Sequence, residues 1–181
     1  HLKTWCYEEM FDSCHYLEKI MDILPATELA SYCYNCLFRY TERLRHNPLK
    51  LPATVMITGC YTSLFRGSGI DKTVDLSHVT TLASSCFANM YWSCTNLKQT
   101  GELPWTTIAA SCYGWMFDDC SHLESGPTVL PALNIPNSAY NGMFTNCISL
   151  KKSPIILGNQ ASQDQSAMFY SCPSLKYIKC L

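Results

Sequence analysis

The sequence predicts an α/β repeat fold, a right-handed solenoid in which each unit of 25–27 residues holds one helix and one short parallel strand. Three observations predict it: a motif that recurs along the chain, an apolar periodicity in the first half of each unit, and a short second half rich in leucine and proline. The chain reads as a single domain. The approximate bounds of its units are 1–27, 28–54, 55–80, 81–106, 107–133, 134–158 and 159–181, about six and a half units in all.

The recurring motif is clearest in the first half of each unit. The segment ILPATELASYCYNCLF at 23–38 nearly recurs at 50–65 and again at 102–117. The first cysteine of each unit sets an origin, and the origins are 26 or 27 residues apart: Cys6, Cys33, Cys60, Cys86 and Cys112, with Ala139 in the sixth unit. A near-constant step of this kind indicates units that bury their apolar faces against one another.

The first half of each unit is predicted to be a helix. At about 100° per residue, apolar positions such as Leu82 and Met90 fall on one arc around the origin cysteine. Polar residues such as Asn35 and Arg39 occupy the other side, as in an amphipathic helix. The threonine of the Leu-Pro-Ala-Thr segment, for example Thr27, precedes the helix and suits its N-cap.

The second half of each unit is predicted to be a short parallel strand. Leu17-x-x-Ile20 and Leu175-x-x-Ile178 alternate too briefly to form an isolated strand. The same stretch recurs in neighbouring units and can pair with them. A helix followed by a parallel strand, repeated, forms a solenoid.

The pattern C-Y-x-x-M-F-x-x-C-x-x-L-x-x-x-P-x-L-P-A-T resembles the BspA-like leucine-rich repeats of Bacteroidetes surface proteins. The matching residues of the fifth unit are Met116, Phe117, Cys120, Leu123, Leu130, Pro131 and Ala132. The resemblance implies a right-handed leucine-rich-repeat solenoid with parallel strands on one face and helices on the other. It also implies secreted or surface-anchored binding proteins, and similar repeats occur in phages that infect these bacteria. It carries no shared catalytic residues.

The twelve cysteines are predicted to form two ladders of buried thiols. Equivalent residues of stacked strands lie about 4.8 Å apart with parallel side chains, whereas a disulfide needs Cβ atoms about 3.8 Å apart that point toward each other. Disulfides are expected first where the register fails, at Cys36, Cys172 and Cys180. A single C-x-x-C, Cys33 to Cys36, is weak evidence for zinc or redox chemistry, so no metal or cofactor is expected.

Charge and motifs exclude several classes of function. A net charge of −1 argues against a nucleic-acid partner. No apolar run approaches the roughly 20 residues that cross a bilayer, so membrane insertion is not expected. No phosphate loop, calcium loop or nucleophile elbow is present, and a short regular repeat seldom builds a catalytic cleft. The chain is therefore not expected to be an enzyme.

Aromatic and basic side chains are the candidates for binding a partner. Trp5 and Trp92 face outward by the angle count, and Trp115 in the adjacent unit lies on the flank, so Trp92 and Trp115 could form an exposed patch. The alternative is that each tryptophan covers a neighbouring side chain. The candidate set is completed by strand-side residues: Lys98, Lys151, Lys152 and Tyr177.

The predicted function is a non-enzymatic binding or adhesion module, secreted or on a bacterial cell surface, that recognises a protein or a glycan. The alternative is a structural or receptor-binding component of a larger assembly, such as a phage particle or a surface appendage, located in the virion. The end units would expose unpaired edges. The ends are therefore expected to pack against flanking domains or other subunits.

Overall fold

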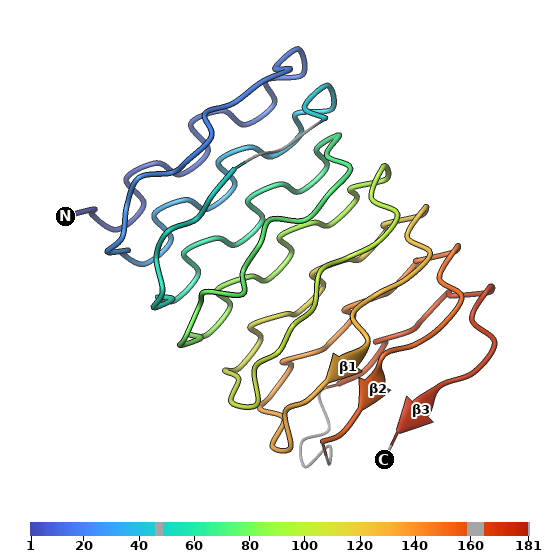
Figure 1. The fold of residues 1–181 in the computed structure, drawn as a ribbon. Helices are drawn as coiled ribbons and strands as arrows, with labels where there is room; N and C mark the ends of the chain where they lie inside the picture. Colours follow the sequence, from blue (N-terminus) through green and yellow to red (C-terminus); the bar gives the residue numbers. More distant parts are fainter. Residues whose placement is uncertain (46–48, 159–164, 181) are drawn as a thin grey trace.

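The computed structural model describes residues 1–45, 49–158 and 165–180. The chain runs back and forth in successive loops laid side by side, with the N-terminus at one end of the row and the C-terminus at the other (Figure 1). We call these loops coils 1 to 7 and give them the bounds of the repeat units. Backbone groups of adjacent coils are hydrogen-bonded; for example, Tyr91 N–H donates to Met116 O at 2.9 Å.

Regular secondary structure in the described residues is limited to three strands of two residues each. The strands β1 (Val129–Leu130), β2 (Ile155–Ile156) and β3 (Lys179–Cys180) form one parallel sheet in the order β1-β2-β3. Other coils are joined on this side by isolated parallel bridges, such as that between Ile23 and Lys50. The pairing is sparse because each coil contributes only one or two residues to it.

The helix-and-strand leucine-rich-repeat solenoid predicted from the sequence is wrong, because the described residues contain no helix and the fold is mostly coil. In an α-helix each N–H bonds to the carbonyl four residues earlier. Here the amides alternate between two other partners. Phe87 N–H donates to Cys112 O of the next coil at 3.1 Å, and Ala88 N–H donates to Ser85 O, three residues back, at 3.2 Å.

A left-handed residue at every fourth position prevents the helix. In coil 4 these residues are Ser85, Asn89 and Ser93, with φ of 56°, 57° and 58°. A positive φ ends each turn after three residues and directs the next N–H toward the following coil. Serine and asparagine occupy this region more readily than branched residues do, and Gly59 and Gly67 take two of the equivalent positions in coil 3.

The side chains that point inward repeat with a period of four. In coil 4 they are fully buried: Cys86, Phe87, Met90, Tyr91 and Cys94. Each stacks on its equivalent in the next coil, so that the Phe65, Tyr91 and Phe117 rings lie 5.9 and 5.5 Å apart between centroids and nearly parallel. Stacked rings and aliphatic side chains therefore form a continuous core between the turn side and the strand side of the coils.

The cysteines take part in this core as thiols. Cys94 Sγ donates to Phe65 O of the preceding coil at 3.0 Å, and Cys120 Sγ donates in the same way to Tyr91 O at 3.1 Å. Of the residues named as disulfide candidates, Cys36 and Cys172 are free thiols, and the side chain of Cys180 lies outside the described part of the chain. No helix among the described residues is long and apolar enough to cross a membrane.

Candidate partner-binding face

Coil 1 presents inward-pointing side chains that no other coil covers. Met10 is 54% exposed, whereas Met90 and Met143, at the same position of coils 4 and 6, are 0% exposed. Tyr7 is exposed, and its equivalent Tyr61 is fully buried. The difference arises because each interior coil lies between two others, whereas coil 1 contacts one coil, coil 2, among the described residues.

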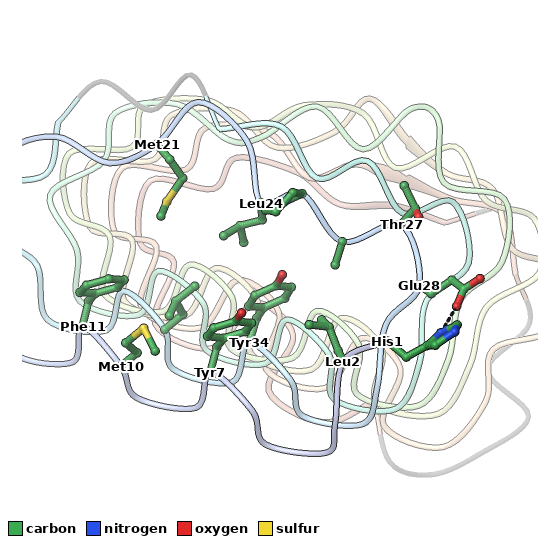
Figure 2. Close-up of a pocket in the computed structure, with 13 residues that line it drawn as sticks. His1, Leu2, Tyr7, Met10, Phe11, Met21, Leu24, Thr27, Glu28 and Tyr34 are labelled. Carbon is green, nitrogen blue, oxygen red and sulfur yellow. Dashed lines mark ion pairs between the residues drawn. The ribbon is translucent and has the colours of Figure 1, made fainter.

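These side chains surround a cavity of about 530 Å³. Figure 2 shows its walls: Phe11 and Tyr7 rise from the turn side of coil 1, while Met21 and Leu24 lie opposite on the returning segment. Coil 2 forms the floor with Tyr34 and Leu37, both buried. At one edge His1 Nδ1 lies 2.5 Å from Glu28 Oε2, an ion pair when the histidine is protonated. The cavity is an apolar recess with a polar rim.

The backbone of coil 1 adds a row of hydrogen-bond acceptors to this face. All the backbone bonds between turn segments run in one direction, from an N–H in one coil to a carbonyl in the following coil, as from Tyr7 N–H to Cys33 O at 3.0 Å. Coil 1 therefore uses its donors on coil 2. Among the described residues, nothing donates to the equivalent carbonyls of coil 1: Thr4, Cys6, Glu8, Met10 and Asp12.

An ordered acidic rim lies beside this row. Arg39 Nη2 of coil 2 lies 2.6 Å from Asp12 Oδ2 and 2.9 Å from Glu9 Oε1. The hydrogen bond from Arg39, together with its charge, lowers the pKa of Asp12 below its ordinary value. Asn35 Nδ2 donates to Glu8 Oε1 at 2.7 Å. Coil 2 thus holds the three carboxylates in place, and the lowered pKa of Asp12 keeps that group negatively charged at neutral pH.

The titratable groups of the core offer no activated nucleophile. Burial raises the pKa of Cys94 and of Cys112 to about 12, so both are neutral thiols at physiological pH. At the open face, Cys6 and Cys14 are exposed free thiols. Within the described ranges no group of three or more histidine, cysteine or acidic side chains could hold a metal ion.

Each of the three predicted tryptophans contacts a residue of a neighbouring coil. Trp5 is 57% exposed in coil 1, where its ring stacks on Tyr32 with centroids 6.0 Å apart. Trp92 is half-buried under the Arg66 guanidinium, 3.9 Å from the ring centroid. Trp115 lies over the backbone of coil 6, where a Cβ on Gly142 would collide with its ring. Trp92 and Trp115 thus each cover a part of a neighbouring coil.

The predicted strand-side residues lie far from the cavity of coil 1. Lys98, Lys151 and Lys152 are exposed on the returning segments of coils 4 and 6, and Lys151 is paired with Glu124. Tyr177, 56% exposed, lies in coil 7 at the opposite end of the row. Trp5 is the one predicted residue that lies in coil 1, and it does not line the cavity.

Sequence reasoning missed the exposed residues that line the cavity, above all Met10 and Tyr7. Their positions are buried in every interior coil, so their residue types indicate core and not surface. The available signal was positional: these inward residues belong to the first unit of the given sequence. That signal predicts an unpaired edge without naming the side chains that it exposes.

Comparison with known proteins adds no further constraint on the site. No family model, curated protein or solved structure matches this chain. The resemblance to a leucine-rich repeat led to an expectation of surface adhesion, and neither the helix-free fold nor the comparisons support that expectation.

Proposed function

We propose that this chain is a non-enzymatic binding module that recognises a protein partner through the open face of coil 1. The observation that carries the proposal is the exposure of Met10 and Tyr7 around the cavity, at positions that are buried in the described coils that lie between two others. Contiguous exposed apolar surface with a polar rim is typical of protein interaction sites.

The chemistry of this face favours a protein over a glycan. The walls of the cavity are apolar and aromatic side chains, which suit the aliphatic or aromatic side chains of a partner. The carbonyl row of coil 1 has free acceptors at alternate residues, which can accept hydrogen bonds from the N–H groups of a partner backbone. A partner that adds a segment along an exposed edge and inserts side chains into pockets would use both features.

A selection with a random peptide library tests this proposal. The library is panned against the 181-residue chain, and the recovered peptides are measured against Met10→Asp and against the control Ile148→Asp, which changes a 51% exposed residue of coil 6. We expect peptides rich in apolar residues that lose at least about tenfold in affinity for Met10→Asp, because a charge in the recess costs roughly 1.4 kcal/mol or more.

Affinity for Ile148→Asp should not change. The proposal fails if no peptide is recovered, or if the recovered peptides bind both variants as well as they bind the original chain. Thermal melting of both variants establishes that each is folded before binding is compared.

A further inference from the structure

We infer that a cavity on the strand side of coils 3 and 4 binds a small organic cation, an ammonium group attached to an aromatic ring by a short chain. This inference goes beyond the proposed function, because the cavity lies in interior coils, away from the open face of coil 1. Three properties of the cavity support it: a space where later coils place a proline, an aromatic floor with one unused hydrogen-bond donor, and two carboxylates at the mouth.

The cavity has a volume of about 250 Å³ and lies between the returning segments of coils 3 and 4. It coincides with a change of residue at one position of the repeat, fifteen residues after the origin. Coils 5 and 6 have buried prolines there, Pro127 and Pro154, whereas coils 3 and 4 have the exposed Asp75 and Gly101. Among the described residues, a Cβ added to Gly101 would meet a single atom, Thr73 Oγ1 at 3.4 Å. The space that a proline fills in the later coils is therefore open here.

The floor of the cavity is aromatic and apolar. Tyr91 and Phe117, whose rings stack with centroids 5.5 Å apart, line it together with Met116, and all three residues are at most 1% exposed. The Tyr91 hydroxyl accepts a hydrogen bond from Val74 N–H, and no described residue accepts the proton of that hydroxyl. The proton can therefore be donated to an oxygen or to the face of an aromatic ring in an occupant.

Two carboxylates, those of Asp75 and Glu102, give the mouth of the cavity its charge. Both residues are exposed, and no described lysine or arginine forms an ion pair with either. Hydrogen bonds from Ser77 lower the pKa of Asp75 below its ordinary value, so this group is negatively charged at neutral pH. Glu102 is oriented by Thr128, whose N–H donates to Oε2 at 2.9 Å and whose hydroxyl donates to Oε1 at 2.8 Å. Negative charge beside an aromatic floor suits a cation with an apolar body.

The size of the cavity favours a ring over an unbranched chain. An apolar protein cavity of about 150 Å³ holds benzene, so a cavity of about 250 Å³ has room for one ring with a short chain. A lysine side chain of a protein partner would also bring an ammonium group to the two carboxylates. Its single row of methylenes would leave much of the volume beside Tyr91 and Phe117 empty, and such gaps forfeit dispersion energy. The occupant is therefore an arylalkylammonium.

Titration of the 181-residue chain with phenethylammonium, followed by the ¹H and ¹⁵N chemical shifts of its amides, tests the inference. We expect saturable shifts at Asp75, Ser77 and Gly101, which line the cavity. Two probes that each lack one feature should bind at least about tenfold more weakly. Hydrocinnamate replaces the ammonium with a carboxylate, which the carboxylates of the mouth repel. Butylammonium replaces the ring with an unbranched chain and buries less apolar surface.

Two variants with matched controls locate the binding in the cavity. Gly101→Leu places a side chain in the open space and should weaken phenethylammonium binding by at least about tenfold. Gln99→Leu adds the same side chain at an exposed position of coil 4 outside the cavity, and affinity should not change. Asp75→Asn should weaken binding by about fivefold, the effect of losing an exposed ion pair. Asp22→Asn, which removes an exposed carboxylate of coil 1, should leave affinity unchanged.

Three results would overturn the inference: no saturable shift at millimolar phenethylammonium, equal affinity for hydrocinnamate, or undiminished binding to Gly101→Leu. Butylammonium that binds as tightly as phenethylammonium would also overturn it and would assign the cavity to a lysine side chain of a partner. The amide spectrum of each variant shows whether it is folded, and if Gly101→Leu does not fold, Asp75→Asn and the three probes decide. The peptide selection reads out Met10 in coil 1, so either experiment can fail without the other.

Discussion

Coils 1 and 4 carry nearly the same inward-pointing side chains in very different surroundings. Cys86, Phe87 and Met90 of coil 4 are inaccessible to solvent, whereas Cys6 and Met10 of coil 1 are exposed. The local backbone is the same in both coils, with left-handed residues at every fourth position. Full burial of Cys6 and Met10 would therefore need a second neighbouring coil, although other apolar side chains of the end coils, such as Leu24 and Met168, are buried with one described neighbour.

The largest expected effect comes from truncating the same side chain in the two coils. Met90→Ala should lower the free energy of unfolding by about 2–5 kcal/mol, because it removes a buried side chain and leaves a cavity. Met10→Ala should lower it by less than about 1 kcal/mol, since much of that side chain is already in water. Urea denaturation of both variants measures the difference, and equal losses would show that coil 1 is covered in solution.

A second comparison concerns two buried tyrosines of interior coils. Tyr91 Oη accepts a hydrogen bond from Val74 N–H at 3.0 Å, whereas the Tyr113 hydroxyl has no partner in the described residues. Tyr91→Phe should lower the free energy of unfolding by about 1–3 kcal/mol, because it leaves the Val74 N–H buried and unpaired. Tyr113→Phe should leave stability unchanged or raise it. Denaturation midpoints in the reverse order would contradict the hydrogen bonding described above.

Stability should depend on pH through Asp118. Burial, followed by the nearby Asp119, raises the pKa of Asp118 from its ordinary 3.8 to about 6, although the Asn146 amide and Arg66 oppose the rise. Between these two values the folded chain binds the proton more tightly than the unfolded chain does, so the contribution of Asp118 to stability falls as pH rises from about 4 to about 6. Asp118→Asn should therefore raise the melting temperature at pH 7 and not at pH 3.

Asp75 provides a control of the opposite sign. Its pKa is lowered by hydrogen bonds from Ser77, whose N–H lies 2.9 Å from Asp75 Oδ1. Asp75→Asn should therefore lower the melting temperature at pH 7 or leave it unchanged. A rise for Asp75→Asn equal to that for Asp118→Asn would mean that any removal of negative charge stabilises the chain, and that the burial of Asp118 is not the cause.

The smallest effect, which requires no substitution, is the reactivity of the thiols. Iodoacetamide should modify Cys6 and Cys14 of the native chain, because both are exposed. Cys94 and Cys120 should stay unmodified until the chain unfolds, since they are buried and burial raises their pKa values. Peptide mass spectrometry after timed labelling distinguishes them, and labelling of Cys94 as fast as that of Cys14 would contradict the difference in burial.

The sequence predicts which residues point inward better than it predicts the backbone that carries them. Residues such as Cys86, Phe87 and Met90 fall on one side whether the chain advances by 100° or by 90° per residue, because the two periods differ little over one segment. A helix is therefore a natural interpretation of a pattern that four-residue turns also produce.

The evidence against a helix lay at the outward positions. Ser85, Asn89 and Ser93 recur every fourth residue and are types that tolerate a positive φ. Trp115 and Tyr32 occupy equivalent positions in other coils and also have a positive φ. Because bulky residues rarely adopt a positive φ, these two residues hide the four-residue period in the sequence. They are accommodated by the absence of a side chain in the following coil, as Gly142 shows beneath Trp115. The match between a bulky residue in one coil and a glycine in the next depends on tertiary contacts. The pattern of residues within one coil does not show it.

The central claim is that the turn segment of each coil bonds to the next coil and not to itself as a helix. Scalar couplings across hydrogen bonds between ¹⁵N and ¹³C′ nuclei test it directly in the labelled protein. The structure predicts a coupling from the Tyr91 amide to the Met116 carbonyl, the pair 2.9 Å apart. A coupling from the Tyr91 amide to the Phe87 carbonyl, the α-helical partner, would contradict the account.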